Sequence, residues 1–244
     1  MRHDLPPLAA NAWLRWGMVG HLIGRDGPLG TVIEVGCGQG GFGVRLASRA
    51  TSYRAYEPDT ASHVVARQRL RHLPHAHVFN NVLPDEADQP AELLCAFEVL
   101  EHLEDDQKVL ALWSDWVRPG GRLLLSVPAH QSRFGPWDEA VGHYRRYERA
   151  ELHEKLAKAG FTAATIVAYG FPLGYVLEVA RNRLAPPVDD TCEVLTSKSG
   201  RLLQPSAMQG AITRVATAPF RMVQPRFARS EKGTGWVVLA QHTG

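Results

Sequence analysis

The 244-residue sequence has little cysteine, almost no excess charge and no long hydrophobic run. Its three cysteines, Cys37, Cys95 and Cys192, are odd in number and widely spaced, so they form neither a disulfide framework nor a metal-ligand pattern. The formal net charge of +2 gives no overall field that would favour nucleic acid. No apolar stretch approaches the ~20 residues that span a bilayer. We therefore expect no metal site, no nucleic-acid partner and no integral membrane segment.

The first residues also lack the basic start and apolar stretch of a signal peptide. We find no internal repeat and no low-complexity segment. With 45% hydrophobic and 21% charged residues, the composition is that of an ordinary globular domain with one large core. These features predict a cytoplasmic protein, and none of them indicates an oligomeric state.

Strand-like and helix-like segments alternate along the chain. This alternation predicts an α/β fold, with a mostly parallel sheet and helices on both faces. Roughly sixty residues separate the sixth strand from the last, far more than a usual connection, which favours an insert that covers a substrate. The expected strands are 32–35, 52–56, 77–82, 93–97, 122–127, 161–169 and 236–240, and the main expected helices are 8–23, 61–73, 109–117, 148–159, 173–184 and 208–221.

A glycine-rich loop follows the first expected strand. The spacing Gly36-x-Gly38-x-x-Gly41, with Glu57 about twenty residues later, satisfies the dinucleotide-binding fingerprint. Glycines there permit positive φ and let a ligand approach the backbone. Taken alone, the loop is therefore compatible with an NAD(P)-dependent oxidoreductase.

Polar groups around this loop favour a different ligand. Glu34 comes two residues before the first glycine, where a carboxylate would favour a cation. Asn81 and Phe97 close later strands at the carboxyl edge of the sheet, where ligands dock in open α/β folds. Together with Glu57 these residues offer an acid for an ammonium, an acid for a ribose, an amide for a purine and an apolar face. The implied ligand is a nucleoside with a positively charged amino-acid tail.

The run from Glu34 to Gly40, Glu-Val-Gly-Cys-Gly-Gln-Gly, resembles the first motif of class I S-adenosylmethionine-dependent methyltransferases. Residues 97–102, 117–121 and the strand ending at Pro128 resemble its ubiquinone-biosynthesis-like branch, the type 11/type 23 methyltransferase domain group. The resemblance covers residues 30–170 and returns at the last strand. It implies a Rossmann-like seven-stranded sheet in the order 3-2-1-4-5-7-6, with the last strand antiparallel. The long connection noted above adds an insert between strands 6 and 7.

The helical pattern of the first residues, which fits either core packing or a lid, the long connection before the last strand and the resemblance together predict a division of the chain and a cofactor site. We expect an N-terminal helical lid at 1–28, a methyltransferase core at 29–170 and 234–244, and a substrate-covering insert at 171–233. The cofactor would be S-adenosylmethionine, with Glu34 near its amino group, Glu57 at its ribose and Asn81 at its adenine. The expected cofactor-binding residues are Glu34, Gly36, Cys37, Gly38, Gly40, Glu57, Pro58, Asn81, Val82, Phe97, Glu98 and His102.

Candidate catalytic residues follow from the chemistry of methyl transfer. The donor is already activated, so the protein mainly aligns the reactants for in-line displacement and excludes water. A hydroxyl acceptor also needs a general base, commonly histidine. The candidates are His102 after the fourth strand, His130 after Pro128, and His143 with Tyr144 in a polar loop.

The acceptor is expected to be a small molecule methylated on a hydroxyl oxygen. An apolar, aromatic series at 169–176 suggests a hydrophobic wall for an aromatic or lipid-linked acceptor, although core packing explains the series equally well. A nicotinamide-dependent oxidoreductase remains the alternative, as does a non-catalytic partner protein with a cofactor fold.

Overall fold

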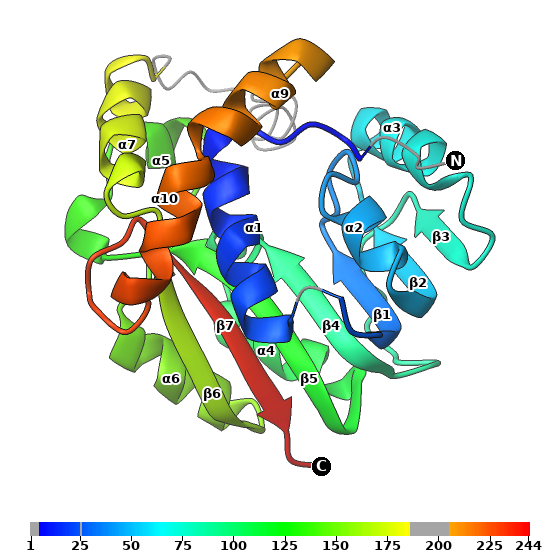
Figure 1. Cartoon of the computed structure of the whole chain (residues 1–244). Helices are drawn as coiled ribbons and strands as arrows, with labels where there is room; N and C mark the ends of the chain where they lie inside the picture. Colours follow the sequence, from blue (N-terminus) through cyan, green and yellow to red (C-terminus); the bar gives the residue numbers. More distant parts are fainter. Residues whose placement is uncertain (1–4, 25, 186–204) are drawn as a thin grey trace.

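The computed structural model describes residues 5–24, 26–185 and 205–244, and it contains one seven-stranded sheet (Figure 1). The strand order is β3-β2-β1-β4-β5-β7-β6. β7 pairs antiparallel with both β5 and β6, whereas the remaining neighbours pair in parallel. The expected topology is thus confirmed. The strands are β1 Gly30–Val35, β2 Ala50–Tyr56, β3 Ala76–Phe79, β4 Ala91–Phe97, β5 Val117–Pro128, β6 Phe161–Tyr169 and β7 Gly235–His242.

Helices cover both faces of this sheet, as expected. Short 3-10 turns at Leu100–His102, Gln131–Arg133 and Gln224–Phe227 complete the regular structure of the described residues. The helices are α1 Ala10–Ile23, α2 Gly43–Ala47, α3 Thr60–Leu70, α4 Asp106–Asp115, α5 Pro136–Ala140, α6 Arg149–Lys158, α7 Leu173–Arg183, α9 Ala207–Ala216 and α10 Ala218–Val223.

Each face of the sheet has its own hydrophobic core. Side chains of a strand point alternately to opposite faces, so neighbouring residues such as Leu123 and Leu124 belong to different cores. One core packs α4 and α6 against the sheet, with Trp113 of α4 fully buried. The other packs α1, α2 and α3 against it. Because both faces are covered, the edge at the carboxyl ends of the parallel strands remains the place for a ligand site.

Two elements differ from the sequence prediction. The third strand ends at Phe79, because the Asn80 side chain donates to the backbone oxygens of Glu57 and Pro58 and turns the chain. The helix expected at 208–221 is two helices, α9 and α10. Pro219 stands in the first turn of α10, a position where the missing N–H costs nothing.

Part of the predicted insert lies outside the described residues. Residues 186–204, which include Cys192, are not described, so the insert is known here from α7, α9 and α10. In Figure 1, α7 and α9 lie at the edge where the parallel strands end. The role of the insert as a substrate cover stays a prediction. No helix among the described residues is long and apolar enough to cross a membrane.

The N-terminal helix α1 is built into the core. Leu14, Met18 and Val19 are fully buried and lie in the same core as Val167 of β6 and Val237 of β7. The N-terminal half of α1 also lines the ligand cavity described below, through Asn11, Ala12 and Arg15. The helix therefore supports the sheet and borders the cavity at the same time, and its action as a lid stays a prediction.

Replacement of Leu14 by alanine tests the structural part of this role. We expect Leu14→Ala to lower the free energy of unfolding by about 2–5 kcal/mol, because a buried leucine is lost and a cavity remains. Urea unfolding followed by circular dichroism measures the change. The matched control is Val64→Ala on α3, where the side chain is 57% exposed and the cost should stay below about 0.5 kcal/mol. Equal small effects of both variants would show that α1 is a dispensable cover.

Candidate active site

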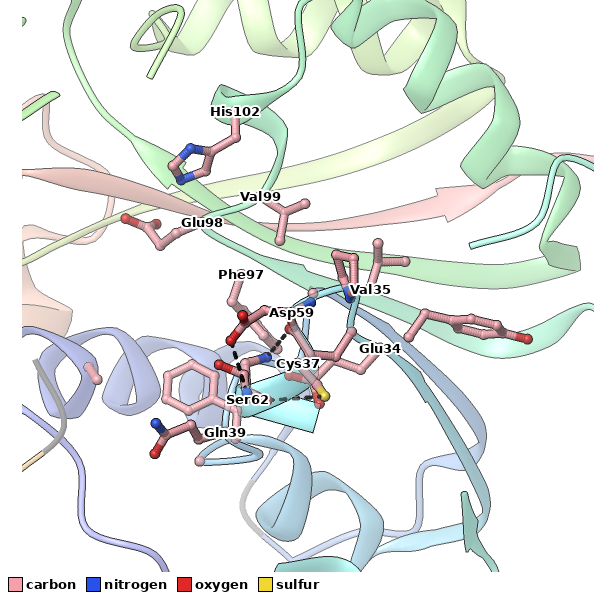
Figure 2. A pocket seen from close by; sticks show the side chains of 18 of the residues that line it. Glu34, Val35, Cys37, Gln39, Asp59, Ser62, Phe97, Glu98, Val99 and His102 are labelled. Atoms are coloured by element: carbon pink, nitrogen blue, oxygen red, sulfur yellow. Dashed lines mark hydrogen bonds between the residues drawn. The ribbon is translucent and has the colours of Figure 1, made fainter. Parts of the chain in front are cut away.

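A cavity of about 1040 Å³ opens at the carboxyl edge of the parallel strands. Its wall combines the glycine loop after β1, the turn after β2, the end of β4, the segment before and within α1, and residues of α5 and α7. Figure 2 shows labelled side chains of this wall, with Glu98 and His102 at one end and Asp59, Ser62 and Gln39 toward the other. Segments distant in the sequence thus meet around one space large enough for a nucleoside and a small acceptor.

The glycine loop forms the floor of this cavity. Gly36 and Gly38 have φ values of 66° and 53°, which favour glycine. A Cβ on Gly36 would lie 2.7 Å from Val99 Cγ2, so a side chain there would collide with the turn after β4. A Cβ on Gly38 would meet nothing within 4 Å. Gly38 therefore leaves open space above its backbone, as a close-fitting ligand requires.

Glu57, at the end of β2, is tied to the glycine loop. Its Oε2 accepts a hydrogen bond of 2.7 Å from the Gly38 N–H, and its Oε1 accepts one of 2.9 Å from the Asp59 N–H. Asp59 in turn caps α3 by accepting from the Ser62 N–H. A carboxylate has about four acceptor positions, so Glu57 retains capacity for hydroxyl donors of a ligand.

Glu34 lies beneath the glycine loop and is only 2% exposed. The Tyr53 O–H donates to its Oε2 at 2.5 Å. Burial raises the pKa of the Glu34 carboxyl to about 8, against the opposing effect of the Tyr53 hydrogen bond. Without a nearby cation, Glu34 therefore carries a proton at neutral pH, and a positive ligand group beside it would displace that proton.

Two histidines meet at the opposite end of the cavity. The ring centroids of His102 and His143 are 4.6 Å apart in an edge-to-face arrangement, and both side chains line the cavity. Burial, followed by the charge of His143, lowers the pKa of His102 to about 4. Glu101 is fully buried beside them with no hydrogen-bond partner for either oxygen among the described residues. Ligand atoms of Glu101, His102 and His143 lie within 4.8 Å of one another, a spacing that a metal ion can bridge, although the sequence predicted no metal.

A buried ionic network holds His143. Its Nδ1 is 2.8 Å from Asp138 Oδ1, and both Asp138 oxygens also accept from Arg146 at 2.7–3.0 Å. Burial raises the pKa of Asp138, but the hydrogen bonds from His143 and Arg146 outweigh it and lower the pKa to about 2. Arg146 also pairs with Glu178 of α7. Asp138 is thus an ionised carboxylate at neutral pH, oriented toward the imidazole.

Glu98 closes the same end of the cavity. It has a positive φ of 55°, rare for a residue with a side chain, directly after β4. Its carboxylate pairs with Arg15 of α1 at 3.0 Å and accepts from the hydroxyls of Ser126 and Tyr169. These partners already occupy Glu98 and connect α1 to the centre of the sheet.

Most of the predicted site residues meet in this cavity, and four do not. Asn81 is exposed and its Oδ1 accepts from the Val82 N–H, while Val82 and Leu83 line the cavity in its place. A Cβ on Gly40 would meet the Ala66 backbone of α3, so this glycine serves helix packing. The predicted residues that line the cavity are Glu34, Gly36, Cys37, Gly38, Glu57, Pro58, Val82, Phe97, Glu98, His102 and His143.

The remaining two are the catalytic candidates His130 and Tyr144. His130 bonds to Glu148 and to the backbone oxygen of Glu231, and it does not line the cavity. Tyr144 is 55% exposed. His143 and His102 are therefore the two histidine candidates that reach the cavity.

Several cavity residues were missed from the sequence. Asp85 lines the wall beyond Val82, and Asp59 had been recognised only as part of a strand end. Asn11, Arg15 and the α5 and α7 residues Trp137 and Arg181 lie far from the glycine loop in sequence. No local motif marks these last four residues, since only the tertiary fold brings them to the site.

Comparison with known proteins agrees with this geometry. Residues 2–166 match the family model described as a methyltransferase domain. The chain is 33% identical over 144 residues to a probable S-adenosylmethionine-dependent methyltransferase of Mycolicibacterium smegmatis, covering 57% of this chain and 52% of the relative. It is 28% identical over 131 residues to a ubiquinone biosynthesis O-methyltransferase of Pseudomonas paraeruginosa, covering 51% and 52%. The chain thus spans about half the length of these curated relatives.

Solved structures show the same fold. The crystal structure of the YcgJ protein of Bacillus subtilis superimposes with a TM-score of 0.61 at 11% identity, covering 94% of this chain and 99% of that one. The match of the family model to more than half of the chain decides between the two cofactors that the glycine loop left open. The chain belongs to the family of class I S-adenosylmethionine-dependent methyltransferase domains.

Proposed function

We propose that the protein transfers a methyl group from S-adenosylmethionine to a hydroxyl oxygen of a small acceptor. The observation that carries this proposal is that His143, which bonds to Asp138, lines the same cavity as the glycine loop. A hydroxyl must lose its proton during transfer, and an oriented imidazole is the usual group that takes it. The name of the Pseudomonas paraeruginosa relative, an O-methyltransferase, is consistent with an oxygen acceptor.

The residues around the glycine loop fit the cofactor. When bound, S-adenosylmethionine supplies an electrophilic methyl group. Gly36 and Gly38 would hold its methionine part, with the Glu34 carboxylate near its ammonium. Glu57 would accept from its ribose hydroxyls with the lone pairs that the backbone leaves free. Val82 and Leu83 offer an apolar surface for the purine, and Asp85 offers an acceptor for its amino group in place of Asn81.

His143 is the proposed general base. Asp138 accepts the Nδ1–H, which leaves Nε2 as the nitrogen that takes the proton from the acceptor hydroxyl. The ionised Asp138 then stabilises the imidazolium. Arg146 holds Asp138 in place through three hydrogen bonds, so the pair is oriented before the acceptor binds.

His102 fits this role less well. With a pKa of about 4, its imidazole would hold an abstracted proton only weakly at neutral pH. Its Nδ1 is buried without a hydrogen-bond partner among the described residues, and the ring bonds to the Gly142 backbone, whereas His143 bonds to the Asp138 carboxylate. His102 lies against His143 and is better placed to position it.

Binding of the cofactor product tests the role of Glu34. We expect S-adenosylhomocysteine to bind with release of a proton, because its ammonium favours the ionised Glu34, whose pKa is otherwise about 8. Affinity should therefore rise with pH and level off above about 8. Isothermal titration calorimetry in buffers of different ionisation enthalpy measures the protons released, and NAD and NADP should give no comparable heat.

The control for this measurement is Glu34→Gln, which still accepts from Tyr53 but has no proton to release. Its heat of binding should be independent of the buffer. A wild-type heat that is also independent of the buffer would show that Glu34 does not face the ammonium.

Methyl transfer tests the role of His143. Radiolabelled S-adenosylmethionine is offered with a panel of phenols and alcohols and with matched amines. With the best hydroxyl acceptor, His143→Ala should lower kcat by about 10²–10⁴-fold, because general-base catalysis is lost. Asp138→Asn should lower kcat in the same direction, because the imidazole loses its orienting carboxylate.

Affinity for S-adenosylhomocysteine should remain unchanged in both variants. The matched control is His153→Ala on the exposed face of α6, which should keep full activity. Exclusive methylation of the amines would contradict the oxygen acceptor. An unchanged kcat in His143→Ala would remove this residue from catalysis.

A further inference from the structure

Arg181 is a cavity residue whose charge the described residues leave unmatched. It lies in the last turn of α7 and lines the cavity. Its Nε is buried and has no hydrogen-bond partner, and no ion pair to Arg181 exists among the described residues. Arginine keeps its positive charge inside proteins, and a buried charge without a partner is costly. The side chain is therefore suited to an anion that the described residues do not provide.

Two acidic residues, Glu98 and Glu178, act on the charge of Arg181, and both already pair with other side chains. Glu98 pairs with Arg15 and accepts from Ser126 and Tyr169. Glu178, one turn earlier on α7, pairs with Arg133 and Arg146. Burial lowers the pKa of Arg181 by more than the charges of Glu98 and Glu178 raise that pKa. Neither carboxylate is free to form the bidentate pair that a guanidinium favours.

Trp137 holds the guanidinium from the side. The Arg181 Cζ lies 5.6 Å from the centre of the Trp137 ring, a cation–π arrangement. The backbone N–H of Trp137 donates to the Asn182 side chain at 3.3 Å, which ties α5 to the end of α7. The guanidinium is thus held against an aromatic face while its N–H groups remain available.

We propose that Arg181 binds an oxyanion group of the acceptor, a carboxylate or a phosphate. Trp137, Val141 and His143 line the cavity together with Arg181, so the anion and the hydroxyl near His143 would belong to one small molecule. The acceptor class is then a hydroxylated acid. This inference rests on the proposed transfer to a small acceptor, and it replaces the expected apolar wall with a charged contact as the determinant of specificity.

Binding to the protein loaded with S-adenosylhomocysteine tests the inference. The probes are hydroxybenzoates, hydroxyphenyl phosphates and the matched neutral hydroxybenzamides, titrated by calorimetry. The wild type should bind at least one of the two anionic series about tenfold or more tightly than the amides, as a charge-assisted hydrogen bond predicts. The series that is preferred distinguishes a carboxylate from a phosphate.

Three variants locate the effect. Arg181→Met should abolish the preference for the anions, and Arg181→Lys should keep part of it, because lysine retains the charge without the planar fork. Arg183→Met removes the same charge from an exposed position of the same helix and should leave the preference unchanged. Affinity for S-adenosylhomocysteine should be the same in all of them.

Retention of the preference in Arg181→Met, equal binding of amides by the wild type, or no binding of either anionic series would each overturn the inference. If Arg181→Met does not fold, the wild-type comparison and Arg181→Lys still decide. Methylation of the same probes is measured in parallel. Anion binding through Arg181 without methylation of any hydroxyl would contradict the proposed oxygen transfer while supporting the anion subsite.

Discussion

The hydrogen bond between the Gly38 N–H and the Glu57 carboxylate joins the ends of two neighbouring strands. The glycine loop after β1 is thereby held against the turn after β2, and the Asp59 N–H binds the other oxygen of the same carboxylate. Because parallel strands end at one edge of the sheet, this single side chain shapes the floor of the whole cavity. A rigid floor fixes where one reactant lies, which leaves the opposite wall to position the other.

That opposite wall depends on charges buried together. Asp138, Arg146 and Glu178 come from α5, the following loop and α7, and each is almost fully buried. Removing one partner of such a group leaves an uncompensated charge, so the arrangement is strongly constrained. The constraint orients His143 and also sets the position of α7, the helix that carries Arg181. The proposed base and the proposed anion contact would therefore depend on one ionic network.

The floor could be predicted from the sequence, as could His102 and His143 in the opposite wall, but the charged groups that surround these histidines could not. Glu34, Gly36, Gly38 and Glu57 lie at strand ends within a short stretch, so local pattern and chain order place them. Arg181 and Asp138 reach the site only through long-range packing, and no periodicity marks them. The predicted place of Asn81 in the cavity was wrong for a local reason. The Asn80 side chain donates to backbone oxygens across the turn and so ends β3 before Asn81.

The position of β7 has a consequence for how this sheet assembles. β7 lies between β5 and β6, and β7 is the one strand neighbour of β6 among the described strands. Until residues 235–242 have paired, β5 and β6 both present open backbone edges to solvent. Such edges bind other chains readily, so a partly folded intermediate would be most vulnerable to aggregation at this end of the sheet. The pairing joins residues separated in sequence by more than a hundred positions, for example Leu124 with Leu239, and contacts of that range form slowly.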